Sequence, residues 1–445
     1  MAELNQEMKQ DLTPQQQLED LLKYTEDLMA EEQYDKAQDV LNNALTLDTF
    51  DLKVYKLYSF VLRMNGNAQG AEIFEKVVMN PGDPSAFYTV ATTLLREKAF
   101  GPALSPLKKV LELVPMAGNV HFDLGYTYLK MFDLEQALEH FKISHEYQPS
   151  MQTGFYVGYT SLLQRDTETA KSYVPYLEAE AAKTGERSAM LDTLIDMIAR
   201  YEAFPPTNLR DWHFVQYGMP LLRLSDEDIK DPSSPLNGRY VFINYGWGNM
   251  AYGMYIFKRL VEELEIMPKY EFVIPAGPKG SPAAFALSQM LDVPLVTPEA
   301  LKSGQPGIVF AAWTDEVDRV AQHLIQNPQV TLFAFSLGYT LQAGLVPDFV
   351  GYLDQSSRLP WQSTVMVTKE GERKERPAMT APPEVVGHYI LDRIEKLTDE
   401  EKAELEQIVD YYKERQHLLK VGEQRTPYRL GFNVESPIIS PRMIV

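Results

Sequence analysis

The sequence predicts a multidomain protein, in which an all-α solenoid of paired helices is followed by an α/β domain built on a parallel sheet. Small residues recur in the first third at intervals of 34, 32, 34 and 33 residues: Ala37, Ala71, Ala103, Ala137 and Ala170. Helix pairs repeated at such a period stack into a ribbon, because one pair cannot bury its apolar face alone. Beyond about residue 205, short apolar runs alternate with helical patterns, which is typical of a parallel sheet covered by helices.

The residues around each alanine suit a helix pair. Gly125 precedes Ala137 by twelve residues, Phe141 follows it by four and Pro149 by twelve. A small residue lets two crossing helices approach to roughly 8 Å, an aromatic ring fills the gap to the next pair, and a proline ends the second helix. Neighbouring units repeat the pattern with Ala91, Leu107, Pro115 and Gly158.

These residues resemble the tetratricopeptide (TPR) repeat over about residues 18–184, or about five units. In the unit around Ala71, the second helix admits another register from Gly70 to Phe74. Residues 187–201 are expected to form a last amphipathic helix that caps the stack. The resemblance implies that the first helix of each pair lines a groove for a protein or peptide partner.

The family's groove positions carry alternating basic and aromatic side chains here: Lys53, Lys56, Phe60, Arg63, Tyr88, Thr92, Arg96, Asn119, Phe122, Tyr126, Lys130 and Tyr159. Such a strip would suit an acidic or C-terminal peptide segment. The alternative is that these side chains only pack between repeats or face solvent. Family members that bind chaperone tails hold the terminal carboxylate with an Asn, which Phe60, Thr92 and Tyr126 replace, so a chaperone tail is not expected.

Composition agrees with a soluble protein of two or three domains. The 445 residues carry a net charge of −20, which argues against a nucleic-acid partner. With no Cys there is no disulfide or thiolate zinc site. No apolar run of about eighteen residues predicts a membrane span. Residues 1–17 are expected to be a polar lead-in rather than a secretory signal, and the absence of Cys fits the cytoplasmic location that we expect.

The second half alternates expected strands and helices. The strands are expected at 239–246, 271–277, 293–296, 307–313 and 330–338, with helices at 250–266, 281–291 and 316–326 between them. In open parallel sheets, ligands bind beyond the carboxyl ends of the strands. The candidate residues there are Gly246, Trp247, Gly248, Asn249, Gly277, Lys279, Gly280, Ser281, Trp313, Thr314, Asp315 and Ser336.

Those residues predict a crevice for a nucleotide or another phosphate-bearing small molecule. Gly-rich turns before helices present backbone N–H groups to an anion, and Lys279 adds a positive charge. Trp247 or Trp313 could stack on a base or sugar. The alternative is that the glycines only make tight turns and the Trp rings pack under the loops.

Two nucleotide-binding families compete for this half. Gly246, Gly248 and Ala251 satisfy the Rossmann G-x-G-x-x-A pattern, but the acidic residue expected at the end of the second strand is missing. The stretch 271–296 is similar to the strand–loop–helix–strand unit of type I phosphoribosyltransferases. That resemblance implies a Rossmann-like sheet, a pyrophosphate loop at 277–280, and the phosphoribosyl-diphosphate signature at 307–325.

The signature is altered, so the domain is predicted to be a degenerate member of that family. Ala311, Ala312 and Trp313 stand where the family has its acidic pair. The carboxylates Asp315, Glu316 and Asp318 replace phosphate-binding groups and would repel a phosphate. The family's mobile hairpin lid is shortened to residues 297–307. Active phosphoribosyl transfer is therefore not expected.

The remaining sequence completes the second half. A hairpin is expected at 363–379 and an amphipathic helix at 383–397, and Thr398 begins a capping box with Glu401. The apolar tail, residues 426–445, is expected to dock as an extended strand on its own chain or on a partner. The expected domains are a solenoid with its cap at 18–203, a linker at 204–237, an α/β domain at 238–380 and C-terminal helices with the docking tail at 381–445.

No catalytic constellation was found. The sequence lacks metal-ligand His spacing, a P-loop and a G-x-S-x-G elbow, so no catalytic residue, metal or cofactor is assigned. His140 and His145 are expected to be surface or groove polar groups, and Asp211 and His213 to lie in the linker. The leading hypothesis is a protein-binding adaptor. The alternatives are an enzyme acting on a nucleotide or ribose phosphate near Lys279, and a glycosyltransferase, for which no sugar-nucleotide signature is present.

Overall fold

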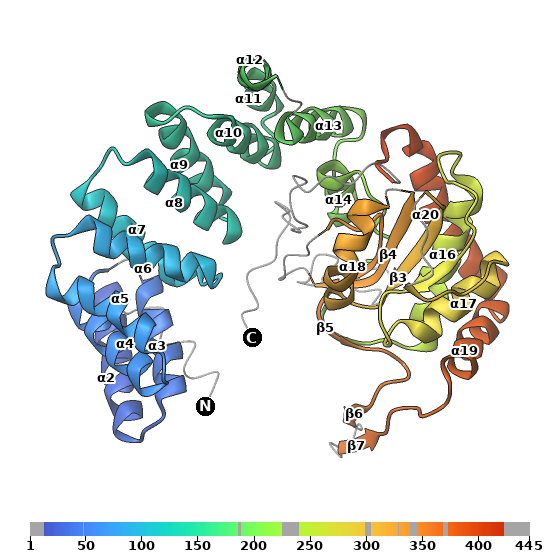
Figure 1. The fold of residues 1–445 in the computed structure, drawn as a ribbon, viewed down its shortest axis with the longest axis horizontal. Coiled ribbons are helices and arrows are strands. Elements are labelled where there is room, and N and C mark those ends of the chain that lie inside the picture. Colours follow the sequence, from blue (N-terminus) through green and yellow to red (C-terminus); the bar gives the residue numbers. More distant parts are fainter. Residues whose placement is uncertain are drawn as a thin grey trace. The chain divides into compact units, whose positions relative to one another are not determined.

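The computed structural model describes residues 13–47, 49–185, 188–224, 240–298, 304–327, 329–338, 345–367 and 373–421. The chain divides into two compact units, Met1–Arg187 and Ser188–Val445. The first is helical and the second contains the sheet, so the predicted fold class is confirmed (Figure 1).

In the first unit, consecutive helices pack against each other in pairs, and the pairs follow one another along the chain (Figure 1). The pairs are α2 (Pro14–Ala30) with α3 (Tyr34–Thr46), α4 (Leu52–Met64) with α5 (Ala68–Met79), α6 (Pro84–Arg96) with α7 (Phe100–Leu113), α8 (Gly118–Lys130) with α9 (Leu134–Tyr147), and α10 (Met151–Leu163) with α11 (Thr167–Ser172). Helix α12 (Val174–Thr184) follows the last pair.

The repeated alanine is the fourth residue of the second helix in every pair, and each one is fully buried: Ala37, Ala71, Ala103, Ala137 and Ala170. In α5 the register that buries Ala71 also buries Phe74. Gly125 and Phe141 meet between α8 and α9, because a Cβ added at Gly125 would lie 2.7 Å from the Phe141 ring. The crossing role predicted for these small residues is therefore confirmed.

The turn inside each pair places one residue in the left-handed region: Glu32, Gly66, Lys98, Phe132 and Arg165, with φ of 59°, 82°, 60°, 60° and 68°. The residue after each of them donates its N–H to a carbonyl of the first helix, as Asp133 does to Tyr128 at 2.9 Å. This is the Schellman ending of a helix. The turns repeat with the period of the alanines, but only Gly66 is a glycine, so the sequence of the other four turns does not indicate a left-handed residue.

The second unit contains a five-stranded parallel sheet in the order β1-β5-β4-β3-β2. The strands are β1 (Tyr240–Asn244), β2 (Val273–Pro275), β3 (Gly307–Ala311), β4 (Val330–Gly338) and β5 (Phe349–Arg358). A parallel bridge joins Val273 to Leu295, so the segment 293–296 runs beside β2. The strand–loop–helix–strand order predicted for 271–296 is present.

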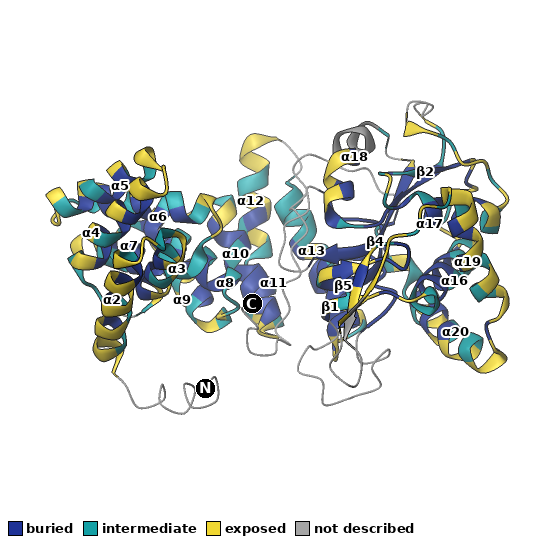
Figure 2. Ribbon diagram, turned by 90° about the horizontal axis from the view of Figure 1, so that it is seen from below, coloured by how far each residue is buried: buried dark blue, intermediate teal, exposed yellow. Residues whose placement is uncertain are grey.

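Helices cover the sheet on both sides (Figures 1 and 2). On one side α16 (Trp247–Glu263), α17 (Ser281–Leu291), α19 (Pro383–Glu395) and α20 (Asp399–Glu414) pack against one another, and α18 (Thr314–Gln326) contacts β3 and β4 from the other. The predicted hairpin is present as β6 (Thr364–Val367) and β7 (Arg373–Arg376). The capping box is also confirmed, since the Thr398 side chain accepts the Glu401 N–H at 3.1 Å.

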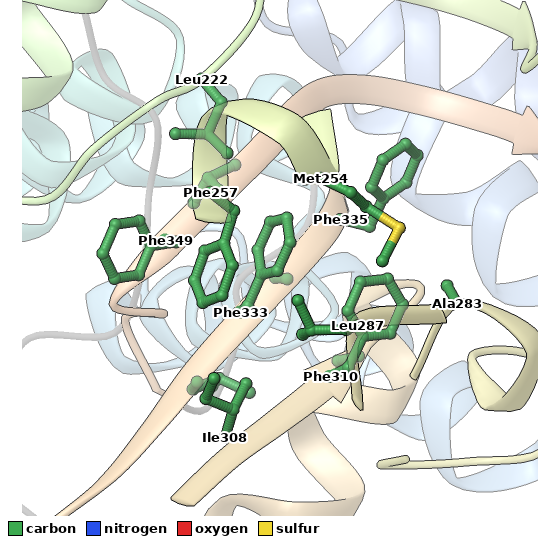
Figure 3. Close-up of a cluster of buried hydrophobic side chains, with 14 of the residues drawn as sticks. Leu222, Met254, Phe257, Ala283, Leu287, Ile308, Phe310, Phe333, Phe335 and Phe349 are labelled. Atoms are coloured by element: carbon green, nitrogen blue, oxygen red, sulfur yellow. The ribbon is translucent and has the colours of Figure 1, made fainter. Parts of the chain in front are cut away.

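Aromatic side chains fill the core of the second unit (Figure 3). The ring of Phe257 on α16 stacks on Phe333 of β4 with centroids 4.4 Å apart, and Phe310 meets Phe333 edge to face at 5.3 Å. Every residue of β4 is buried. A strand buried on both faces reads as a continuous apolar run, which is why its sequence predicted a central strand.

Helices α13 (Ala189–Ala203) and α14 (Leu209–Tyr217) belong to the second unit. All residues from 209 to 216 are buried. The Arg200 guanidinium donates to the Val215 carbonyl at 2.9 Å, and the Leu222 N–H donates to the Val350 carbonyl of β5 at 2.8 Å. Residues that the sequence assigned to a linker therefore contribute to the core of the second unit, and the expected cap helix is hydrogen-bonded to them.

Four expectations concern residues that are not described, in whole or in part. The first twelve residues of the polar lead-in, residues 225–237 of the expected linker, residues 299–303 of the expected lid and the docking tail at 426–445 lie outside the described residues. In the described part of the chain, no helix combines the length and apolar character needed to cross a bilayer.

Candidate functional sites

Three of the five first helices, α4, α6 and α8, carry a cationic strip, which we define as Lys53, Lys56, Arg63, Arg96 and Lys130. Asp123 is the one carboxylate in the sequences of α4, α6, α8 and α10. The Tyr88 hydroxyl donates to Asp123 at 2.8 Å, and burial raises the pKa of that carboxyl. Helices α4, α6 and α8 therefore carry an excess of positive charge in a protein whose net charge is −20, whereas the first helix of the first pair, α2, carries Glu19, Asp20, Glu26 and Asp27.

Neighbouring acids moderate the charge at one end of this strip. Lys53 forms an ion pair with Glu26 of α2 at 2.7 Å, and Arg63 pairs with Glu75 of α5. Lys56 and Arg96 are exposed. Between Lys56 and Arg63, the Phe60 side chain is 45% exposed although its ring edge contacts Tyr34.

Aromatic rings gather farther along, on α8 and α10. Phe122 and Tyr126 both contact Tyr156, with ring centroids 5.4 Å and 6.1 Å apart, and the Lys130 ammonium lies 5.1 Å from the Tyr126 centroid. These side chains are half-buried, whereas Asn119 is exposed. The prediction did not include Tyr156, whose ring contacts five others and therefore lies at the centre of the cluster: Phe122, Tyr126, Phe141, Phe155 and Tyr159.

Tyr159 does not line an open groove. Its ring stacks on Phe155 at 5.6 Å and only 8% of the residue is exposed. The position was carried over from the family's pattern, but helix α10 is apolar around most of its circumference and buries this position. Tyr159 is therefore a packing residue here.

At the strand ends of the second unit, the first glycine turn is closed by its own side chains. The Gly246 N–H donates to Asn249 Oδ1 at 2.9 Å, so Asn249 caps α16. The Trp247 ring stacks on Tyr389 at 5.2 Å and lies 6.1 Å from Trp361. A Cβ at Gly248 would make only ordinary contacts with Tyr252.

The second turn brings together Lys279, Trp313 and Asp315, as the sequence predicted. The Lys279 ammonium lies 4.2 Å from the Trp313 ring centroid and 3.3 Å from Asp315 Oδ2. The indole N–H of Trp361 donates to the Lys279 carbonyl at 3.2 Å. The positive charge expected for an anionic ligand is therefore already balanced by a carboxylate of the same chain.

Glu316 lies inside this turn. Its Oε1 accepts the Lys279 N–H at 3.2 Å and its Oε2 accepts the Ala312 N–H at 2.8 Å. The residue is fully buried, and burial raises the pKa of the carboxyl, while the backbone donors oppose the rise. The sequence had placed Glu316 near a phosphate site but had not identified it as the group that fills the turn.

Other polar groups at the strand ends are also bonded within the chain. Thr314 Oγ1 accepts the Gly338 N–H at 2.8 Å, and the Ser281 hydroxyl donates to the Gly277 carbonyl at 3.3 Å. The hydroxyls of Tyr245 and Ser336 donate to Asp354 at 2.7 Å and 2.5 Å.

The sequence analysis missed Asp354, although a carboxylate in a buried strand is a signal for a hydrogen-bonded cluster. Burial raises the pKa of this carboxyl. Among the described residues, no cluster of three or more His, Asp or Glu side chains is arranged to hold a metal ion.

Comparisons with known proteins concern the first unit. No family model and no curated protein matches the chain. The structure of MamA from Desulfovibrio magneticus RS-1 is similar at 17% identity and a TM-score of 0.26, over 38% of this chain and 98% of that one. The PilF structure from Pseudomonas aeruginosa is similar at 16% identity and a TM-score of 0.27, over 43% and 86%.

MamA and PilF are TPR-repeat proteins, and the similarity concerns the helical N-terminal half. The helix pairs themselves, with their buried alanines and repeated turns, define the first unit as a solenoid of helix pairs.

Proposed function

We propose that this protein is an adaptor whose cationic strip binds an acidic segment of a partner protein. The observation that carries the proposal is the segregation of charge within the repeats. The first helices α4, α6 and α8 carry Lys53, Lys56, Arg63, Arg96 and Lys130 against one hydrogen-bonded carboxylate, while α10 has no charged side chain and the acidic α2 stands outside the strip. Lys and Arg form charge-assisted hydrogen bonds with carboxylates, and complementary charge directs the partner to this surface.

Apolar anchors support the same surface. Phe60 is almost half exposed on α4, and the half-buried rings of Phe122 and Tyr126 lie on α8. Interfaces obtain most of their binding free energy from a few aromatic and Arg side chains. The partner segment is therefore expected to alternate acidic and apolar residues.

Charge reversal tests this proposal. Lys56→Glu and Lys130→Glu change first helices, and the matched controls Lys76→Glu and Lys142→Glu change exposed lysines on the second helices of the same pairs. Affinity capture from a native extract, quantified by mass spectrometry, should lose partner proteins tenfold or more with the strip variants only. If all four variants recover the same amount of partner protein, the cationic strip does not bind the partner.

We further propose that the second unit is a phosphoribosyltransferase-like domain that has lost transfer chemistry and provides a second interface. Its strand–loop–helix–strand unit at 271–296 supports the resemblance. Ala311 and Ala312, buried at the end of β3, offer no carboxylate for the sugar hydroxyls.

The competing function is an enzyme or sensor for a nucleotide or ribose phosphate at the strand ends. Thermal-shift measurements with nucleotides and phosphoribosyl diphosphate separate the two. A ligand at a hundred times its Kd stabilises a protein by about 2.7 kcal/mol. We expect no shift with the wild-type chain, and a clear shift would favour the competing function.

A further inference from the structure

The turn between β2 and α17 surrounds a carboxylate of the same chain. Glu316 reaches it from the first turn of α18, and its two oxygens accept N–H groups from Lys279 and Ala312 at 3.2 Å and 2.8 Å. The Gly280 N–H also donates to this carboxylate. Backbone donors from two strand ends therefore converge on one anionic group.

The glycines of the turn make this approach sterically feasible. A Cβ added at Gly277 would lie 2.2 Å from Glu316 Oε1, and one added at Gly280 would lie 3.2 Å from Oε2. The first distance is far below a van der Waals contact, so any side chain at Gly277 would expel the carboxylate. Glycine is used where backbone must come close to a bound group.

From this geometry we infer that residues 276–280 form an oxyanion-binding loop whose anion is the chain's own Glu316 carboxylate. The loop has the N–H donors that a phosphate would use, and an internal carboxylate satisfies them. A phosphate-bearing ligand is excluded because it would have to displace a buried, hydrogen-bonded group. This inference rests on the proposed loss of phosphoribosyl transfer and explains it by occupancy of the loop.

The charges around the loop agree with this assignment. Lys279 is paired with Asp315, and Asp315 stands next to Glu316 in the sequence. Arg319 also lies here, since its Nη1 is 3.0 Å from a Cβ added at Gly277. An incoming phosphate would therefore meet two carboxylates beside one ammonium and one guanidinium, so the loop has no excess of positive charge. Once the Glu316 side chain is removed, the loop N–H groups lack an acceptor and Lys279 remains nearby. The emptied loop is then expected to accept a free oxyanion.

The test compares the full-length wild type with Glu316→Ala and Asp315→Ala. The probe is inorganic pyrophosphate, with binding followed by isothermal titration calorimetry at constant ionic strength. Glu316→Ala should bind pyrophosphate at least tenfold more tightly than the wild type, while Asp315→Ala, which leaves Glu316 in the loop, should gain less than threefold. Tight binding to the wild type, or no gain in a folded Glu316→Ala protein, would overturn the inference.

A second measurement covers the case in which Glu316→Ala does not fold. Glu316→Asp keeps the charge and withdraws it by one methylene, so it should show a smaller gain in pyrophosphate affinity, and no gain would count against the inference. Added acetate should raise the melting temperature of Glu316→Ala more than sodium chloride does, because acetate restores the missing carboxylate. Partner capture with Lys56→Glu tests the cationic strip and does not depend on pyrophosphate binding. The proposal for the strip and the inference about Glu316 can therefore fail separately.

Discussion

The hydrogen that Gly125 carries in place of a side chain faces the ring of Phe141. An added methyl group would lie 2.7 Å from the nearest ring carbon, well inside a carbon–carbon contact. Phe141 is fully buried and follows the repeated Ala137 by four residues. In this repeat the first helix has no side chain at position 125, and the Phe141 ring of the second helix occupies the space where the two helices cross.

Gly125→Ala is therefore expected to destabilise the first unit. Replacing a helical Gly by Ala gains about 1 kcal/mol of helix propensity, whereas overpacking a core costs about 1–3 kcal/mol. We expect a net loss of about 1 kcal/mol in the free energy of unfolding, measured by urea denaturation. In the background of Phe141→Leu, which shortens the ring to a branched chain, the same change should be neutral or stabilising. A similar loss in both backgrounds would show that the ring is not the cause.

In one of the left-handed turns, a substitution is expected to stabilise the protein. Lys98 is exposed and has φ of 60°, whereas Gly66 occupies the equivalent turn of the preceding pair with no atom within 4 Å of an added Cβ. Lys98→Gly should raise the free energy of unfolding by about 0.5–1 kcal/mol, because glycine adopts positive φ without steric cost. Gly66→Ala should lower it by about 1 kcal/mol. Urea denaturation of both variants gives the comparison, and changes of equal sign would refute it.

The repeat could be predicted from the sequence because each pair buries an alanine at the same position, the fourth residue of its second helix. Ala37 to Ala170 keep their spacing, so periodicity alone located the second helices. The turns were not predicted, because four of the five left-handed residues are not glycine and carry no local signal. Their conformation belongs to the hydrogen-bonded ending of each first helix, as in the bond from Asp133 to Tyr128.

Helix α14 shows why the second unit was harder to predict. Arg210, Asp211 and His213 give its sequence a polar character that suits a linker. They are buried because each finds a non-local or backbone partner: Arg210 donates to the Leu221 carbonyl at 3.1 Å, and Tyr411 donates to Asp211 at 2.7 Å. A pattern of apolar residues in the sequence cannot predict hydrogen-bond partners of this kind.

The position of Glu316 was hidden for a similar reason. Locally it is an acidic residue in the first turn of a helix, a common place for Asp and Glu. Its partner Lys279 is 37 residues earlier, across the β2–β3 pair. The sequence analysis treats the glycine loop and the carboxylates as separate features, and only the fold shows that the Glu316 carboxylate lies in the loop.

The capping box at Thr398 has a second role that can be measured. Glu401 accepts the Thr398 N–H at 2.9 Å and also binds Arg393 and the Tyr252 hydroxyl, which joins α16, α19 and α20. Glu401→Ala should lower the free energy of unfolding by about 1–2 kcal/mol. Glu400→Ala, in the same turn and exposed, should change it by less than about 0.5 kcal/mol. Chemical denaturation near pH 7 makes this comparison.

The same pair of variants gives a pH dependence. Hydrogen bonds from Arg393, Tyr252 and Thr398 lower the pKa of Glu401 from 4.5 to about 2. A carboxyl with a lowered pKa in the folded state stabilises the protein above its unfolded pKa, and this contribution is lost as the pH falls through the folded value. The stability gap between wild type and Glu401→Ala should therefore narrow between about pH 4.5 and 2. A gap independent of pH would contradict the assignment.

A histidine pair links α8 and α9 in the first unit. His121 Nε2 lies 3.1 Å from the Pro115 carbonyl, which can only accept, so the hydrogen of neutral His121 is on Nε2. Its Nδ1 then accepts from His140 Nδ1, 2.9 Å away. The His140 ring also stacks on Tyr128 at 5.6 Å. The expectation of a surface or groove polar group missed this contact, whose two members are 19 residues apart.

This pair should make the first unit sensitive to acid. Burial, the neighbouring His121 and Lys108 lower the pKa of His140 from 6.5 to about 4. The unfolded chain therefore binds the extra proton first, and stability that is complete above about pH 6.5 is lost as the pH falls towards 4, by roughly 1–3 kcal/mol. His140→Asn retains an amide that can donate to His121 Nδ1 but does not titrate in this range. Its urea midpoint should fall less than that of the wild type between pH 7.5 and 4.5. His145 and His213 titrate equally in both proteins, so parallel decreases would exclude His140 as the source.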